Sequence, residues 1–184
     1  MNIKVQIKNK EKNTLENGVI RLVKNDELDK VMDLQDKVIE WLPNKDLYYP
    51  TSRESIMRFT GEMGEIVGCF NENNELIGMG VYCKLGKDKE NYGYDINISG
   101  DDLLKVAQVE STIVHKAYRG NKLQVKICGI IEDLAKKENM NLIMSTVSPD
   151  NPHSLNSFIK REYKIEKEKE KYGGLRRCIL SKKL

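Results

Sequence analysis

VESTIVHKAYRGNKLQ (Val109–Gln124) decides the fold of this chain, because an apolar strand here runs into a glycine-containing turn and then into a helical pattern. A second strand pattern, NLIMSTV (Asn141–Val147), meets the turn SPDNPHS (Ser148–Ser154), which opens a short helix. A turn of this kind at a helix N-terminus leaves several backbone N–H groups without partners. Together with the positive end of the helix dipole, these donors form a site for a phosphate or pyrophosphate.

Specific motifs surround the turn. RGNKLQ (Arg119–Gln124) matches the phosphate-loop pattern Arg/Gln-x-x-Gly-x-Gly/Ala, and VHKAY (Val114–Tyr118) matches the V-x-P-x-[YF] segment that precedes it, with Lys116 at the usual proline. VSPDN (Val147–Asn151) matches V-x-P-x-N, and the positions that follow it in the same pattern are Ser154, Phe158 and Tyr163. With these motifs the chain resembles the coenzyme A-binding half of the GNAT-type N-acetyltransferase superfamily.

The resemblance implies both a fold and an activity. The fold is a single α+β domain with a mixed, mainly antiparallel sheet, helices on both faces and splayed central strands, here those ending at His115 and Val147. The order of strand and helix patterns predicts the same class. The activity is transfer of an acetyl group from acetyl-CoA, without a metal, to a primary amine by direct attack on the thioester. The implied contacts to acetyl-CoA come from Ile113, Val114, Arg119, Gly120, Asn121, Lys122, Leu123, Gln124, Asn151, Ser154 and Phe158.

Several positions depart from the family pattern. Lys122 and Gln124 replace small residues of the phosphate loop, where glycine lets the backbone approach a ligand closely. The Lys122 ammonium is therefore either solvated or helps to hold phosphate. Phe158 replaces a tyrosine proposed as proton donor to the departing thiolate, so that role is vacant or is filled by another group or water. Glu162 replaces a glycine, which affects a helix ending.

Glu110 and Val114 are the catalytic candidates. An amine with a pKa of about 10 is mostly protonated at neutral pH, so the transfer benefits from a general base. Glu110 lies on the first strand, where several family members carry an acidic group, and period two places it on one sheet face with Thr112 and Val114. The alternative for Glu110 is a strand-end carboxylate in a salt bridge or in water. The resemblance implies that the Val114 backbone N–H stabilises the charged oxygen of the intermediate.

Other polar and aromatic residues near the motifs have two interpretations each. Asn151 is the cap of a helix that starts at an Asn-Pro turn, a contact to the pantetheine arm, or both. The two histidines, His115 and His153, are expected to be structural or exposed rather than catalytic. Two roles stay open for the aromatic cluster after the first helix, lining the acceptor pocket or capping the core; its members are Trp41, Tyr48 and Tyr49.

Length and composition restrict the class of protein. The 184 residues fit one domain, with 1–103 as acceptor side and sheet edge, 104–163 as coenzyme A-binding unit and 164–184 as C-terminal strands. The net charge is +3, and the lysines and glutamates are interleaved without a basic stripe, which argues against a nucleic-acid partner. No run approaches the roughly 18–20 apolar residues that span a bilayer, and the N-terminus lacks the apolar core of a secretory signal.

We therefore expect a cytoplasmic protein with no membrane partner. Its four cysteines lack C-x-x-C spacing, which favours single thiols in or near the core over a metal site or a disulfide. Its partners are expected to be acetyl-CoA and an amine-bearing acceptor, a small molecule or a peptide. Dimers are frequent in the family, so the resemblance also leaves a homodimer open.

Patterns outside the motif region predict the remaining elements. Alternating apolar residues from Ile3 to Ile7 predict an extra first strand, and helical spacing from Leu28 to Ile39 predicts a helix with Asn25 or Asp26 as its cap. Thr51-x-x-Glu54 has the spacing of a capping box. Segment 86–102 has no clear assignment. The remaining strands are expected at 19–23, 65–70, 76–83, 164–172 and 175–182, with the Glu-Lys alternation of 166–171 at a solvated edge or loop.

Two other function classes compete with the acetyltransferase. One is a catalytically silent coenzyme A-binding module, a sensor or a partner-binding domain, which the phenylalanine at position 158 favours. The other is a nucleic-acid-binding domain, favoured only by the mildly basic charge. Thiol release from acetyl-CoA in the presence of amines separates the enzyme from the silent module.

Overall fold

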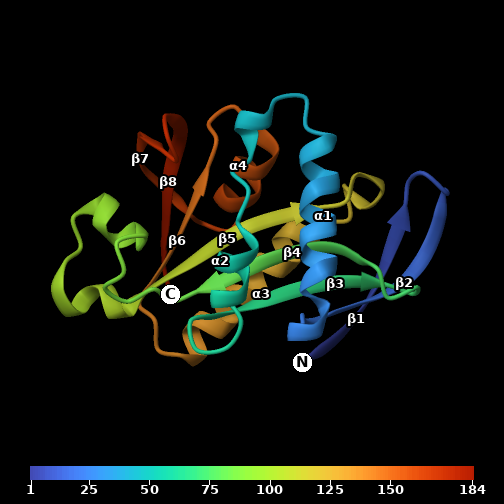
Figure 1. Cartoon of the computed structure of the whole chain (residues 1–184), viewed down its shortest axis with the longest axis horizontal. Coiled ribbons are helices and arrows are strands. Elements are labelled where there is room, and N and C mark those ends of the chain that lie inside the picture. The colour runs from blue at the N-terminus through green and yellow to red at the C-terminus, as the bar shows by residue number, and fades with distance from the viewer.

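The computed structural model describes residues 1–184 as four α-helices and eight strands, with short 3-10 turns between them (Figure 1). The strands are β1 Asn2–Asn9, β2 Thr14–Leu22, β3 Gly64–Asn71, β4 Leu76–Cys83, β5 Val106–Val114, β6 Leu142–Val147, β7 Lys164–Lys171 and β8 Leu175–Lys183. The helices are α1 Leu28–Glu40, α2 Arg53–Arg58, α3 Leu123–Lys137 and α4 Pro152–Ile159. This order confirms the predicted succession of elements, including the extra first strand.

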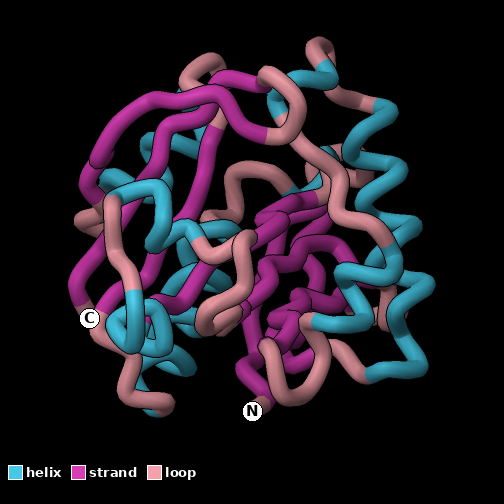
Figure 2. The backbone as a smooth tube through the Cα atoms, turned by 60° about the vertical axis from the view of Figure 1, so that its left-hand side comes forward, coloured by secondary structure: helices cyan, strands magenta, loops and turns pink.

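All strands belong to one sheet in the order β1-β2-β3-β4-β5-β6-β8-β7. Every neighbouring pair is antiparallel except β5 and β6, which are parallel. In the rotated view the strands near the C-terminus arch away from the other strands of the sheet (Figure 2). The mixed, mainly antiparallel sheet predicted from the sequence is confirmed.

Helices cover both faces of the sheet, and each face buries its own core. The core beneath α3 includes Ile127 and Ile131 of that helix with Ala107 and Val109 of β5. The opposite core packs α1 and α2 against the other side of β3 and β4 (Figure 1). The four cysteines are free and buried, as expected from their spacing.

The parallel pair β5–β6 forks in the middle of the sheet. Its pairing extends only from Val106 opposite Leu142 to Val109 opposite Ser145. Beyond this point the rest of β5 has no partner on that side, which confirms the splayed central strands. Ser145 marks the fork, because its hydroxyl donates to the Val109 carbonyl at 2.9 Å.

A β-bulge in β5 lies directly beyond the fork. On β4, Met79 faces Ile113 and Val81 faces Glu110, so β5 has two residues, Ser111 and Thr112, where β4 has only Gly80. Ser111 accommodates the extra residue with a left-handed φ of 45°. A bulge bends its strand and reverses which side chains face each side of the sheet.

Several local predictions were wrong or incomplete. Asn25 and Asp26 lie in a 3-10 turn before α1, whose N-cap is Glu27. The cap of α2 is Ser52, whose hydroxyl accepts from the Ser55 backbone N–H at 3.1 Å, so the Thr51 capping box does not form. Segment 86–102 contains the 3-10 turn Tyr92–Ile96. The exposed, charged β7 forms one edge of the sheet, as its Glu-Lys alternation predicted.

Glu162 occupies the position after α4 that requires a left-handed backbone. Its φ is 68°, and the Tyr163 N–H reaches back to the Phe158 carbonyl at 3.2 Å, which is the closing bond of a Schellman motif. A side chain with a Cβ is strained in this region, whereas glycine is not. The departure from the family's glycine therefore costs stability at the helix ending.

We predict that Glu162→Gly raises the free energy of unfolding by about 1 kcal/mol. For a chain of this size the midpoint of thermal unfolding rises by roughly 2–4 °C. Glu162→Ala is the control, because it removes the carboxylate, which lies 3.9 Å from Lys182 Nζ, but keeps the Cβ. Equal stability of the glycine and alanine variants in thermal denaturation would contradict the assignment.

Candidate active site

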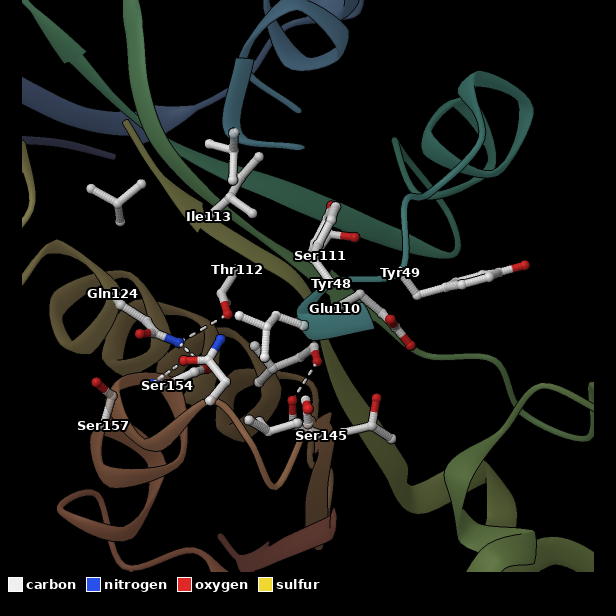
Figure 3. A pocket seen from close by; sticks show the side chains of 18 of the residues that line it. Tyr48, Tyr49, Glu110, Ser111, Thr112, Ile113, Gln124, Ser145, Ser154 and Ser157 are labelled. Atoms are coloured by element: carbon white, nitrogen blue, oxygen red, sulfur yellow. Dashed lines mark hydrogen bonds between the residues drawn. The ribbon is translucent and has the colours of Figure 1, made fainter. Parts of the chain in front are cut away.

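A cavity of about 1340 Å³ follows the fork from α3 and α4 across to α1, α2 and the β7–β8 turn. Side chains of β5, α3, α4 and the loop after α1 point into it (Figure 3). Small-molecule sites usually occupy about 300–1,000 Å³. The cavity is therefore large enough for two ligands side by side.

The turn before α3 presents a row of unpaired backbone donors. No backbone carbonyl accepts from any N–H between Gly120 and Val125. Gly120 has a φ of 91°, which glycine adopts without strain, and Lys122, the N-cap of α3, has a φ of 57°. The side chains of Arg119 and Lys122 are exposed here. The predicted phosphate loop thus has the donors, the helix N-terminus and the cationic side chains that an anion site needs.

The extra N-terminal hairpin supports this loop. Asn121 accepts from the Lys8 N–H at 2.8 Å and donates to the Lys8 carbonyl at 2.9 Å and the Tyr118 carbonyl at 2.8 Å. The Lys10 N–H donates to the Ala117 carbonyl at 2.8 Å, and its side chain lines the cavity. The Asn121 side chain is therefore used to fix the loop, and only its backbone N–H is free for a ligand.

Gln124 connects the two arms of the fork. Its amide donates to Thr112 Oγ1 at 3.1 Å on β5 and to Ser154 Oγ at 3.0 Å on α4 (Figure 3). Ser154 is in turn fixed by Asn151, whose side chain accepts from the Ser154 N–H at 3.1 Å. Asn151 is thus the helix cap that one interpretation predicted, and it also lines the cavity.

The backbone of β5 beyond the fork faces the cavity. His115 donates its N–H to the Ile77 carbonyl of β4 at 2.9 Å, and hydrogen-bonded and non-bonded pairs alternate in an antiparallel ladder. The neighbouring pair of Gly78 and Val114 is therefore non-bonded, and the Val114 N–H points away from β4 toward the diverged β6. Val114 and Ile113 both line the cavity.

Glu110 lies in the wall of the cavity with an altered acidity. Burial raises the pKa of its carboxyl from 4.5 to about 7, while hydrogen bonds from Tyr92 and Gln108 act in the opposite direction. The Gln108 amide donates to Glu110 Oε1 at 2.9 Å. A carboxyl with a pKa of about 7 exchanges protons readily at neutral pH.

The expectation that Glu110, Thr112 and Val114 share one sheet face is wrong. Glu110 faces Val81 and the core of α1, whereas Thr112 contacts Gln124 and Val114 packs against the core of α3. The extra residue of the bulge lies between them and reverses the alternation. Glu110 thus lies on the α1 side of the sheet and the phosphate loop on the α3 side.

Two other predicted residues have their side chains in the core. Phe158 is 1% exposed and packs edge to face on Tyr163, with ring centroids 5.0 Å apart, so its ring does not line the cavity. The apolar ring packs there because it has no hydroxyl group to hydrate. Leu123 is also buried, and it offers a ligand only its backbone N–H.

The aromatic cluster after α1 divides between the two roles. Trp41 packs edge to face on His115, with ring centroids 4.5 Å apart, and is not part of the cavity wall. Tyr48 and Tyr49 line the cavity (Figure 3). The His115 ring accepts from the Ala117 N–H at 3.2 Å, and burial lowers its pKa, in agreement with a structural role.

Sequence reasoning missed the tyrosines that surround Glu110. The hydroxyls of Tyr92 and Tyr172 lie 2.6 Å apart, and Tyr172 also contacts Thr146 Oγ1 at 3.0 Å. Tyr172 stacks on Tyr49, with ring centroids 4.4 Å apart. Tyr92 belongs to the unassigned segment and Tyr172 to the β7–β8 turn, so no local motif could have joined them. These rings close the cavity on the side of Glu110.

No group of three or more His, Cys, Asp or Glu side chains is arranged to hold a metal ion. None of the helices has the length and apolar character needed to cross a bilayer.

A forked sheet beside a helix N-terminus with free N–H groups is the architecture that the resemblance implied for an acetyltransferase. A sequence model of the acetyltransferase (GNAT) family matches residues 33–161. The match covers more than half of the chain, so the chain belongs to the GNAT acetyltransferase family. Members of this family use acetyl-CoA as co-substrate.

Solved structures with the same fold include the N-acetyltransferase from Staphylococcus aureus Mu50, at a TM-score of 0.69 and 14% identity over 91% of this chain and 98% of that one. The GNAT domain of S. lividans PAT has a TM-score of 0.68 and 14% identity, over 100% of this chain and 97% of that one. The ribosomal-protein-S18-alanine N-acetyltransferase from Escherichia coli has a TM-score of 0.66 and 11% identity, over 90% of this chain and 93% of that one. Comparison with curated protein sequences finds no match. At these identities the structural likeness shows the fold alone.

We predict that Asn121→Ala lowers the free energy of unfolding by about 1–3 kcal/mol, because three hydrogen bonds are lost, two to Lys8 of β1 and one to the Tyr118 carbonyl. Asn73→Ala, at an exposed hairpin position, is the matched control and is expected to stay within about 0.5 kcal/mol of the parent. Urea denaturation measures both variants. Equal stability of the two would show that Asn121 does not fix the loop.

Proposed function

We propose that this protein transfers the acetyl group of acetyl-CoA to the primary amine of an acceptor, and that this occurs by direct attack of the amine on the thioester. The observation that carries the proposal is the row of free backbone N–H groups from Gly120 to Val125 at the mouth of the β5–β6 fork. A pyrophosphate at that row would orient the rest of a coenzyme A molecule along the fork. The proposal keeps 104–163 as the coenzyme A-binding unit, 1–103 as the acceptor side and sheet edge, and 164–184 as the C-terminal strands.

The residues that hold the donor act mainly through their backbones. Gly120 to Val125 would donate N–H groups to the pyrophosphate, with Arg119 and Lys122 adding charge at the same end. Val114 would pair with the amides of the pantetheine arm as a further strand does, since that edge of β5 lacks a neighbour, and Ile113 lines the cavity beside it. Gln124 and Ser154, already bonded to each other, would form the floor beneath the arm.

Glu110 and Val114 would carry the chemistry. Glu110 would take a proton from the acceptor ammonium, which leaves a lone pair on nitrogen to attack the thioester carbonyl carbon. The Val114 N–H would stabilise the oxyanion of the tetrahedral intermediate, a contribution of roughly 3 kcal/mol for one preorganised donor. When the carbon–sulfur bond breaks, the sulfur leaves with the electron pair, the nitrogen gives up its second proton to water, and the product is a neutral amide. A thiol has a pKa of about 8.5, so the thiolate can leave unprotonated.

The second candidate is a catalytically silent coenzyme A-binding module. The position of Phe158 favours it, because a buried phenyl ring supplies no proton to the departing sulfur. Binding of acetyl-CoA without amine-dependent thiol release across a panel of small amines and peptides would support this candidate. Release that depends on an amine supports the enzyme.

We predict that kcat/KM for acetyl transfer rises with pH through about 7, because the Glu110 base must be deprotonated. Glu110→Gln is expected to lower kcat by about 10²-fold or more and to remove this limb of the pH profile. Thiol release measured from pH 5.5 to 9 tests both statements. An unchanged profile in the variant would exclude Glu110 as the base.

Glu90→Gln is the matched control, since Glu90 also lines the cavity and its charge raises the pKa of Glu110. This variant should keep the rise of kcat/KM with pH and move it to lower pH.

A measurement of stability against pH checks that Glu110 titrates as described. Because its pKa in the folded protein lies above its ordinary value, the parent should lose stability relative to Glu110→Gln as pH rises from about 4.5 to 7.

A further inference from the structure

Arg177 is a buried cation without an anionic partner. It is 3% exposed, its Nη1 donates to the Arg176 carbonyl at 2.8 Å, and its Nη2 has no hydrogen-bond partner. No carboxylate lies within 4.0 Å of the guanidinium. Burial lowers the pKa of Arg177, yet an arginine side chain stays charged in proteins.

Several other shielded charges in this protein are paired. Arg161 and Lys182 both contact Glu132, at 2.6 and 2.8 Å, and Lys171 contacts Asp95 at 2.5 Å. A buried ion without a partner is strongly unfavourable unless a bound ligand of opposite charge compensates it. The unpaired guanidinium of Arg177 therefore points to an anion that is supplied from outside the chain.

Arg177 belongs to the wall of the cavity. Its guanidinium carbon lies 5.7 Å from the centre of the Tyr172 ring. Tyr172 contacts Tyr92 through its hydroxyl, and Tyr92 interacts with Glu110. The two tyrosines thus connect Arg177 to the proposed base.

Arg177 lies on the acceptor side of the sheet, away from the phosphate loop. It shares a face of β8 with Ile179, which packs in the cluster of Tyr92, while the neighbouring Leu180 packs in the core of α3. Glu110 lies on the face opposite α3 as well. In the sheet only β6 lies between β5 and β8, and β5 diverges from β6 beyond Val109. An anion at Arg177 therefore belongs to the acceptor and not to the coenzyme.

We propose that the acceptor is an amine that carries a carboxylate, as an amino acid does, and that Arg177 binds this carboxylate while Glu110 receives the proton of the amine. The planar guanidinium presents paired N–H donors that fit a carboxylate. Arg177 is then a specificity-determining residue of the acceptor site. The inference rests on the proposed acetyl transfer and adds to that proposal the class of acceptor.

The test compares matched amines with the parent protein and two variants. Free amino acids, their neutral carboxamides and phosphoethanolamine are the probes, and binding to the coenzyme A-loaded protein is measured by calorimetry beside kcat/KM for thiol release. Arg177→Met removes the cation at similar length. Arg176→Met is the control, because Arg176 is the adjacent exposed residue, paired with Glu168 at 2.9 Å.

The expected result is that the parent prefers at least one amino acid over its carboxamide by about 10- to 100-fold, in binding and in kcat/KM. Arg177→Met should abolish that preference with acetyl-CoA affinity unchanged, and Arg176→Met should keep it. Equal binding of every amino acid and its carboxamide to the parent would overturn the inference, whether or not turnover is seen. A preference for phosphoethanolamine over all amino acids would overturn the carboxylate assignment.

The two proposals fail in different ways. Amine-dependent thiol release without any carboxylate preference leaves the acetyltransferase intact and removes the role of Arg177. Selective binding of an amino acid that Arg177→Met abolishes, without thiol release from acetyl-CoA, supports the anion site and contradicts the catalytic proposal.

Discussion

The extra residue that β5 carries opposite Gly80 constrains the geometry of the whole cleft. Because Ser111 and Thr112 share the space of one residue, β5 bends away from β6 directly after the last paired position, Val109. The bend leaves the Val114 N–H without a neighbouring strand. It also turns Glu110 toward α1 while Thr112 faces Gln124 and α3. A single insertion in the register thus separates a coenzyme side from an acceptor side and exposes backbone donors between them.

Different parts of the chain stabilise the two sides. On the coenzyme side, the phosphate loop is fixed by the β1–β2 hairpin through Asn121, so its free N–H groups are held in place before any ligand arrives. On the acceptor side, burial raises the pKa of Glu110, while a hydrogen bond from Tyr92, whose hydroxyl also contacts Tyr172, acts in the opposite direction. The β7–β8 turn contributes Tyr172, and β8 contributes Arg177, so the last strands of the chain complete the acceptor pocket.

The sequence could predict what depends on local pattern and not what depends on tertiary contact. The strand, turn and helix around Arg119 follow from periodicity and motif, and their positions are confirmed. The bulge at Ser111 has no glycine or proline to mark it, so period two placed Thr112 on the wrong face. The link between Tyr92 and Tyr172 joins residues 80 positions apart. The isolation of Arg177 is a property of its surroundings, which a linear sequence does not display.

The central claim is that free backbone N–H groups on α3 and β5 hold the coenzyme. Amide hydrogen exchange, measured residue by residue with and without coenzyme A, tests it most directly. The account predicts slower exchange from Gly120 to Val125 and at Val114 when coenzyme A is bound, with little change on the β1–β2 hairpin away from Asn121. Unchanged exchange at Gly120–Val125 and Val114 under conditions where coenzyme A binds would contradict the account.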